Sequence, residues 1–452
     1  MACSVLSVPR IDPWPSKAAA SSTMSPYATV PTAAGTFSPL RISLRLDNHN
    51  FSPSLLERIV EASARLCSFA DASFALHLAG VEISSRQVQR IAVEIGSELA
   101  RQRDRKVLLR RRRQLPPRVP VTPAVVAVEV DGGRLHSREP GCGPGVHHQQ
   151  GKEDKVACLV TLKSRVYKQD PQPQPPASFL EPRRVRRLVQ QIKGHAGDKP
   201  QDASGQEDAS ASVQEPSRTQ PRPGASQRLV RTCVASMADS RSFGPMVAAE
   251  AQERDFYRAS RRAYLGDGAK YNWWIQKVYF SDFEAIVDLL HVLCYIYLAA
   301  WGVGADEAQG WSIYTDWMRW CWQGRVKEVI EELKSWQGKI GKPSKGEELD
   351  EKDPRRLVAE ALSYLKNNQS RMDYPRYRRQ GLPITSSLAE SLVGEINARV
   401  KAPQKFWNRP EGAEAILQLR AFVLSEDDRL ARYFAQRPGN PYRPRNSAQA
   451  SP

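Results

Sequence analysis

Three acidic residues of this chain stand where catalytic carboxylates are often found. Asp131 follows the β-branched run AVVAVEV and Asp267 follows RRAYLG, and a glycine comes directly after each of them, which lets a ligand approach the backbone closely. Glu390 lies in the first turn of a helix predicted to begin after Pro383. Carboxylates on separate elements can hold two Mg²⁺ ions about 3.5 to 4 Å apart, one activating an attacking oxygen and the other stabilising a leaving one. These residues could therefore support metal-dependent phosphoryl transfer.

The same residues also have a plainer structural interpretation. Asp-Gly is a common turn sequence, which would account for Asp131 and Asp267. Ser387 and Glu390 have the spacing of a capping box, in which a serine and a glutamate satisfy amide groups at the start of a helix. The residues alone favour this plainer interpretation, so a catalytic role needs a further argument.

The elements that must position the acids predict an α/β architecture. Four short apolar and β-branched runs have the character of strands: AVVAVEV, VACLVTL, LVRTCVASM and RRAYLG. A helix is predicted around FGPMVAAEAQERDF, and apolar stripes at helical spacing cover 326–336 and 357–365. Because strands and helices alternate, we expect layers of helices on a sheet.

The segment before the first predicted strand indicates a small helical domain. Helices are predicted over 52–66 and 84–99, with a break at Gly80. If the second is a recognition helix, four polar side chains on its solvent side could reach base edges in the major groove: Arg86, Gln87, Gln89 and Arg90. The alternative is a plain helical bundle. Four later arginines could add phosphate contacts or form a solvated basic linker: Arg110, Arg111, Arg112 and Arg113.

The overall composition points to a polyanionic partner. The chain has 66 Lys and Arg against 49 Asp and Glu, a net charge of +17, which favours nucleic acid. The longest apolar run, 286–301, is shorter than a membrane span and contains Asp288 and His291, so no membrane association is predicted. The N-terminus lacks the pattern of a secretion signal, which predicts a cytoplasmic location. Seven cysteines without a Cys-x-x-Cys pair fit neither a disulfide framework nor a zinc ribbon.

Longer segments of the chain resemble a known protein family. They include VEVDGGRLHSREPG, KEDKVACLVTL, FLEPRRVRRLV, FGPMVAAEAQ, YLGDGAKYNWWIQ and the stretch from YRRQGLPITSSLAESLVGE through FWNRPEGAEAILQLRA. Together they are similar to the ISKra family of insertion-sequence transposases, from about residue 41 to 445. The resemblance implies a DDE enzyme with an RNase H-like core, a mixed five-stranded sheet that carries a helical insertion and follows an all-α helix-turn-helix domain. Asp131, Asp267 and Glu390 match the catalytic positions and would bind two Mg²⁺ ions, for which Mn²⁺ can substitute.

The resemblance, together with the composition, also implies a domain plan. The expected parts are a disordered N-terminus (1–40), a helical helix-turn-helix DNA-binding domain with a basic linker (41–118), an RNase H-like catalytic domain (119–445) and a disordered tail (446–452). Within the catalytic domain we expect a mostly disordered insertion at 169–227, with one basic helical island, and a helical insertion at 292–372.

A protein of this kind would cut DNA at transposon ends and join those ends to target DNA. Its partners would be double-stranded DNA, as terminal inverted repeats and as target, and further copies of itself in a synaptic complex, in a bacterial cytoplasm beside the nucleoid. The motif DLLH, which runs from Asp288 to His291, looks like a signature of related transposases. In that interpretation His291 donates a hydrogen bond to an oxygen of the scissile phosphate. The alternative is a core histidine whose hydrogen bonds are satisfied.

The chain departs from the family pattern in two places. Gly151-Lys152 stands where an aromatic-basic pair is expected before Glu153-Asp154-Lys155, and the insertion at 194–227 is long. A second interpretation is therefore a catalytically inactive or domesticated DNA-binding protein derived from a transposase. A third is a recombinase that attacks DNA through a tyrosine or serine, although the sequence has no basic and histidine constellation around a tyrosine that would require it.

Overall fold

The computed structural model describes residues 51–136, 151–193, 226–344, 346–401, 407 and 410–437. The chain divides into two compact units, 1–92 with 430–452 and 93–429, and each unit is described by itself. The segments predicted to be disordered at 1–40 and 446–452 lie outside the described residues, as does the part of the predicted insertion at 194–225.

Helices make up the described part of the first unit. They are α2 (Pro53–Arg65), α3 (Phe69–Leu78), the start of α4 (Ser85–Arg111) and nearly all of α15 (Arg429–Ala435). Helices α2 and α3 pack against each other. The hydroxyls of Ser52 and Ser68 accept hydrogen bonds from first-turn amides of these two helices, which satisfies N–H groups that have no partner within the helix.

Helix α4 is a single helix of 27 residues. The apolar stripe predicted over 84–99 is buried. The basic run after Arg101, for which the sequence predicts a linker, is also helical as far as Arg111, because no proline or glycine interrupts it before Pro116. Arg113 then adopts a left-handed φ of 56°, which ends the helix.

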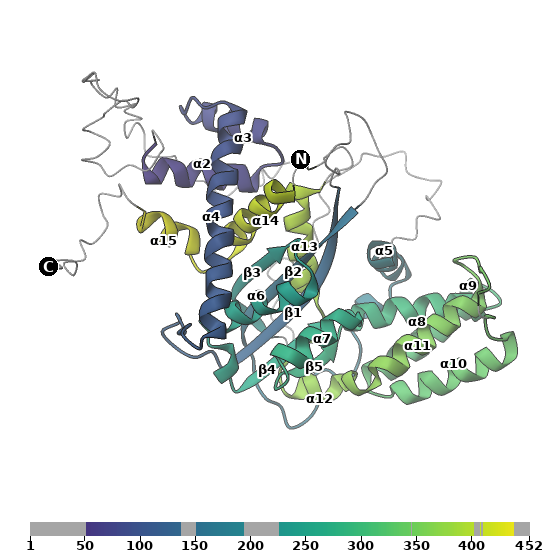
Figure 1. Cartoon of the computed structure of the whole chain (residues 1–452). Helices are drawn as coiled ribbons and strands as arrows, with labels where there is room; N and C mark the ends of the chain where they lie inside the picture. The colour runs from purple at the N-terminus through teal and green to yellow at the C-terminus, as the bar shows by residue number, and fades with distance from the viewer. Residues whose placement is uncertain are drawn as a thin grey trace, which may run out of the picture. The chain divides into compact units, whose positions relative to one another are not determined.

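A mixed five-stranded sheet forms the centre of the second unit (Figure 1). Its strands are β1 (Val125–His136), β2 (Gly151–Lys163), β3 (Gln227–Ser236), β4 (Arg261–Gly266) and β5 (Glu284–Val287). They lie in the order β3-β2-β1-β4-β5, with β2 antiparallel to β1 and β3, and with β4 and β5 parallel to β1. The predicted mixed α/β architecture is therefore confirmed.

The helices that follow α4 in this unit are α5 (Pro182–Lys193), α6 (Ser240–Glu253), α7 (Lys270–Tyr279), α8 (Leu289–Val303), α9 (Glu307–Trp322), α10 (Val326–Ile340), α11 (Pro354–Asn368), α12 (Tyr374–Arg379), α13 (Ser387–Val400) and α14 (Pro410–Leu424). No helix among the described residues is both long and apolar enough to cross a membrane.

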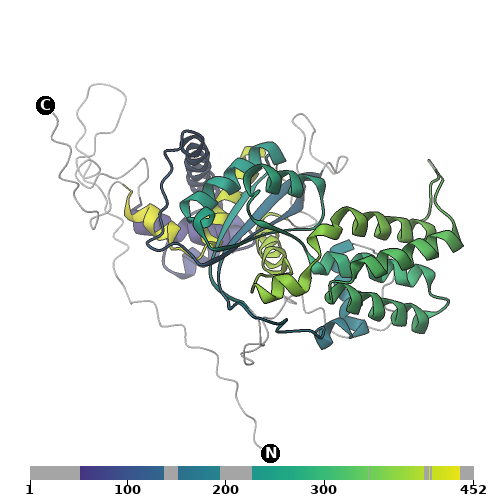
Figure 2. The ribbon, with the colours of Figure 1, turned by 90° about the horizontal axis from the view of Figure 1, so that it is seen from below.

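Helices cover both faces of the sheet, because alternate residues of a strand point to opposite sides. Val126, Val128 and Val130 of β1 join the hydrophobic core beneath α6 and α7. Glu129 points to the other side, where α13 packs on β1 and β2 and α14 packs on β3. Figure 2 shows helices on both sides of the strands. Asp131, the catalytic candidate on β1, alternates with Val130 and therefore lies on the same face as Glu129.

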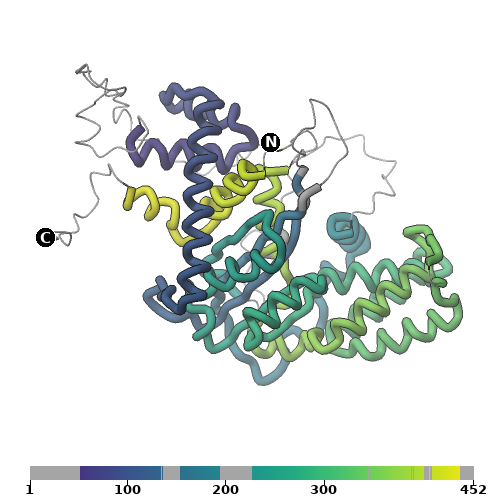
Figure 3. Tube along the Cα trace, in the orientation of Figure 1, coloured from purple at the N-terminus to yellow at the C-terminus, as the bar shows by residue number. Residues whose placement is uncertain are grey.

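Helices α8 to α11, which come between β5 and α12 in chain order, pack side by side (Figure 3). They occupy the stretch for which the sequence predicts a helical insertion. Helix α5 packs on α8, and the chain that precedes α5 is held by an ion pair of 2.5 Å between Asp170 and Arg378. The described part of the predicted disordered insertion, 169–193, therefore contains ordered structure in addition to the predicted basic helix.

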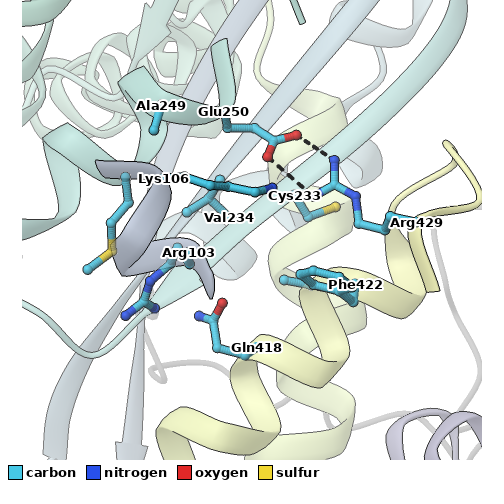
Figure 4. Close-up of a pocket in the computed structure, with 11 residues that line it drawn as sticks. Arg103, Lys106, Cys233, Val234, Ala249, Glu250, Gln418, Phe422 and Arg429 are labelled. Carbon is cyan, nitrogen blue, oxygen red and sulfur yellow. Dashed lines mark hydrogen bonds and ion pairs between the residues drawn. The ribbon is translucent and has the colours of Figure 1, made fainter. Parts of the chain in front are cut away.

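A buried ion pair joins α6 to Arg429, the first residue of α15 (Figure 4). The Glu250 carboxylate, 5% exposed, lies 2.5 Å from the Arg429 guanidinium beside Lys106 and Cys233. The cavity that these residues line measures about 20 Å³, enough for a single water. Burial alone would raise the pKa of Glu250, but the charges of Arg429 and Lys106 outweigh it and lower that pKa to about 2. The ion pair stabilises the packing of the helices on β3. The cavity beside it is too small to bind a substrate.

Candidate active site

Three neighbouring parallel strands lead to aspartates at the same edge of the sheet. The strand register aligns Val130 of β1 with the ends of β4 and β5. The next residue in each of the three segments is an aspartate: Asp131, Asp267 and Asp288. Because parallel strands present their carboxyl ends at one edge, residues distant in sequence meet there. The structure thus brings together two of the three predicted acids and adds Asp288.

Asp131 lies within a strand, so the Asp-Gly turn interpretation is wrong for this residue. Strand β1 continues to His136 and stays paired with β2. The carboxylate of Asp131 accepts a hydrogen bond of 2.7 Å from the Gly132 N–H. Burial raises the pKa of Asp131, the Gly132 N–H and His291 oppose the rise, and the charges of Asp267 and Asp288 add to it. Neighbouring carboxylates therefore repel Asp131, and a bound cation would relieve that repulsion.

Asp267 does form the predicted turn. Its Oδ1 accepts hydrogen bonds from the Ala269 N–H at 2.9 Å and from Asn272 Nδ2 at 2.8 Å. Gly268 has a φ of +100°, and a Cβ there would lie 2.5 Å from the ring of Tyr364. The Tyr364 hydroxyl donates to the backbone oxygen of Asp267 at 2.8 Å. The plain and the catalytic interpretations are compatible here, because the turn orients the carboxylate at the strand end.

Asp288 and His291 form a buried pair at the start of α8. The Nδ1 atom of His291 lies 2.6 Å from Asp288 Oδ2, and Asp288 is fully buried. Burial raises the pKa of Asp288, but the hydrogen bond and charge of His291, with two backbone N–H groups, outweigh it and lower that pKa. Asp288 therefore stays ionised and fixes the orientation of the imidazole beside Asp131. The histidine is hydrogen-bonded, as the plain interpretation predicts, and its charge also acts on Asp131.

The start of α13 does not have the predicted capping box. The N-cap residue is Ser386, so Ser387 lies inside the helix and cannot cap it with Glu390. Two carboxylates from other elements, Glu129 of β1 and Asp288 at the start of α8, accept hydrogen bonds from these amides instead. The Ser386 N–H donates to Asp288 Oδ1, and the Ala389 N–H donates to Glu129 Oε2, each at 2.9 Å.

These two bonds attach the first turn of α13 to the strands that carry the aspartates. The backbone of Glu390 follows Ala389 directly in this turn, and Ala389 is bonded to Glu129, two residues before Asp131. Glu129 and Asp131 share a face of the sheet because they alternate with Val130. The side chain of Glu390 lies outside the part of the chain that the structure describes.

Sequence reasoning missed a further carboxylate, Asp154 on β2. It pairs with Gly133 of β1, where a Cβ would lie 2.6 Å from Asp154 Oδ1. Both carboxylate oxygens are buried and have no hydrogen-bond partner among the described residues. Burial raises the pKa of Asp154 to about 6. The segment KEDK showed an acid here, but only the register of β1 and β2 brings it beside the glycines that follow Asp131.

The described side chains do not by themselves complete a metal site. Among them, no group of three or more His, Cys, Asp and Glu residues is arranged to hold an ion, and the side chain of Glu390 is not one of those described. The carboxylates of Asp131 and Asp267 are nevertheless the oxygen donors that Mg²⁺ prefers. Their adjacent positions, where the pairing of β1 with β4 ends, suit two ions that share ligands.

The predicted DNA-binding residues fall into two groups. In the first unit Arg86, Gln89 and Arg90 are exposed and Gln87 is half-buried, so these side chains lie on the solvent side of α4, as predicted. In the second unit Arg110, Arg111, Arg112 and Arg113 lie at the end of α4.

Arg110 differs from the three arginines that follow it. It is half-buried, and its Nη2 donates to the Tyr257 hydroxyl at 3.2 Å, close to the start of β4 and opposite the end that carries Asp267. Arg111, Arg112 and Arg113 are exposed, and Arg111 and Arg113 line an open cavity of about 380 Å³. Arg110 therefore packs in the fold, whereas its neighbours remain accessible to phosphate groups.

No protein-family model and no curated protein sequence matches this chain.

Proposed function

We propose that this protein is a DNA transposase whose second unit is an RNase H-like catalytic domain. The strand order β3-β2-β1-β4-β5, with β2 running against the others and helices on both faces, supports the RNase H-like assignment. The observation that carries the proposal is that Asp131 and Asp267 meet where the pairing of β1 with β4 ends, beside the first turn of α13. The resemblance of the surrounding segments to ISKra transposases supports the same conclusion.

The proposed reaction uses the acids as ligands and His291 as a hydrogen-bond donor. Asp131, Asp267 and Glu390 would hold two Mg²⁺ ions, which, when bound, activate water for attack on a phosphodiester and stabilise the leaving oxygen. The ionised Asp288 orients the His291 ring through the contact with Nδ1. A protonated His291 beside the acids would donate a hydrogen bond to an oxygen of the scissile phosphate. The freed 3′ hydroxyl would then attack target DNA in the same site.

In this proposal the helices of 41–118 form the helix-turn-helix domain that finds the element's ends. The exposed Arg86, Gln89 and Arg90 would reach base edges, and Arg111 to Arg113 would contact phosphates. The partners would be terminal inverted repeats, target DNA and further copies of the chain in a synaptic complex. Mn²⁺ would substitute for Mg²⁺, and the bacterial nucleoid would be the site of action.

A nicking assay on supercoiled plasmid with Mg²⁺ or Mn²⁺ tests the proposal. We expect Asp131→Asn to retain DNA affinity and to lose cleavage by about a thousandfold or more, because removing a group used in the transition state costs on the order of 4 kcal/mol. Asp316→Asn is the matched control, since Asp316 is an exposed acid on α9. Cleavage by Asp131→Asn at the rate of the unaltered chain would remove Asp131 from the mechanism.

The second candidate is a DNA-binding protein without catalytic activity. Asp267 supports it, because that carboxylate already has a structural task in its turn. This candidate predicts salt-sensitive DNA binding without nicking in either metal. A protein–DNA adduct that survives denaturation would instead indicate a covalent recombinase.

A further inference from the structure

Helix α5 has an apolar side that is buried against the protein and a basic side that is exposed. Val185 and Val189 are buried, and the helix packs on α8. At 3.6 residues per turn, Arg183 and Arg187 lie on the side opposite these valines. Both arginines are exposed, as is Arg184 on the flank.

The charges on the outer side of α5 lack acidic partners in the described part of the chain. Arg186 pairs with Glu307 and lies over the Trp301 ring, so it belongs to the packing on the helical insertion. No described acid forms an ion pair with Arg183 or Arg187. Like charges four residues apart destabilise a helix by about 0.2 to 0.5 kcal/mol. An anionic ligand would offset that cost.

A short chain of side-chain contacts connects the end of α5 to the acidic edge. Lys193, the last residue of α5, lies 3.3 Å from the ring centroid of Tyr295. Tyr295 stacks on Tyr364 with 3.9 Å between centroids, and the Tyr364 hydroxyl donates to the Asp267 backbone. Tyr295 also lies one turn after His291 on α8. The C-terminal end of α5 is therefore close to the proposed active site, and Arg187 lies about 9 Å before that end along the helix.

A membrane surface fits α5 poorly, although the helix is basic and amphipathic. Helices that lie in a membrane interface bury their apolar face in lipid, but Val185 and Val189 are covered by protein. Binding to the regularly spaced phosphates of a nucleic acid, in contrast, requires only the exposed arginines and no exposed apolar face.

We propose that α5 binds the phosphate backbone of the nucleic-acid strand that enters the acidic edge, with Arg183 and Arg187 as the contacting residues and Arg184 beside them. This inference rests on the proposed function for the identity of the strand. The binding itself does not require catalysis.

The test compares two charge reversals of equal size in full-length Asp131→Asn protein, which keeps the DNA uncut. Arg183→Glu/Arg187→Glu alters α5, and Lys327→Glu/Lys342→Glu alters exposed lysines on and just after α10. Affinity for a labelled duplex of random sequence is measured by fluorescence anisotropy over a range of salt concentrations. Circular dichroism and thermal unfolding check that each variant is folded.

We expect the α5 variant to bind about tenfold more weakly and its salt slope to fall by about 1.8, at 0.9 for each lost phosphate contact. The α10 variant should bind like its parent. Equal affinities and slopes for the two variants would overturn the role of α5. So would anionic phosphatidylserine vesicles that bind through Arg183 and Arg187 while DNA binding is unchanged.

Failure of the proposed function has a different outcome. A chain with Asp131 intact that binds DNA through Arg183 and Arg187, yet never nicks it with Mg²⁺ or Mn²⁺, would support the α5 proposal and contradict the catalytic one.

Discussion

Replacing Glu250 by Gln removes the buried charge that opposes Arg429, and the structure sets the size of the effect. The pKa of Glu250 is lowered from 4.5 to about 2, and each pKa unit corresponds to about 1.4 kcal/mol, so the ionised form contributes roughly 3 kcal/mol to folding. Breaking one side of a buried ion pair costs a similar amount, about 3 to 5 kcal/mol. We therefore expect Glu250→Gln to lower the free energy of unfolding by about 3 kcal/mol near neutral pH.

The pH dependence gives the sharper test of this prediction. Because the folded pKa of Glu250 is depressed, its contribution is complete above pH 4.5 and is lost as the pH falls toward 2. The difference between the unaltered chain and Glu250→Gln should shrink over that window.

Urea unfolding followed by circular dichroism measures both effects, with Glu331→Gln on the exposed side of α10 as the control. In a double-mutant cycle, adding Arg429→Gln to Glu250→Gln should cost less than Arg429→Gln alone. A loss below 1 kcal/mol, or a difference that does not change with pH, would refute the assignment of the Glu250–Arg429 pair as a stabilising one.

Two further predictions concern the edge of the sheet. Asp154→Asn should stabilise the metal-free protein by about 1 to 2 kcal/mol near pH 8, because the folded pKa of about 6 means that ionised Asp154 opposes folding above that pH. The gain in stability should vanish near pH 4, and urea unfolding in the presence of a chelator measures it at both pH values. A loss of stability at pH 8 would contradict this prediction. Gly268→Ala should lower the free energy of unfolding by about 2 kcal/mol or more, because the residue has a φ of +100° and a Cβ would clash with the Tyr364 ring. The control is the same change at exposed Gly338, where a Cβ meets nothing within 4 Å. Gly338→Ala should improve stability slightly in thermal unfolding.

Local patterns in the sequence determined the elements and the acids at their ends. The β-branched runs predicted strands that the structure contains, and the apolar stripes of α4, α10 and α11 predicted helices with buried sides. Asp131 and Asp267 could be picked out because a glycine follows each at the end of a strand pattern. Periodicity is visible along the chain because a helix or strand repeats its contacts every few residues.

Only the tertiary structure decided how those elements meet. The register of β1, β4 and β5 aligns Asp288 with the two predicted acids, and the register of β1 with β2 brings Asp154 to Gly133. The N-terminus of α13 is bound by Glu129 and Asp288 instead of by its own capping box. Register and helix docking depend on contacts between residues far apart in sequence, and no local spacing encodes those contacts.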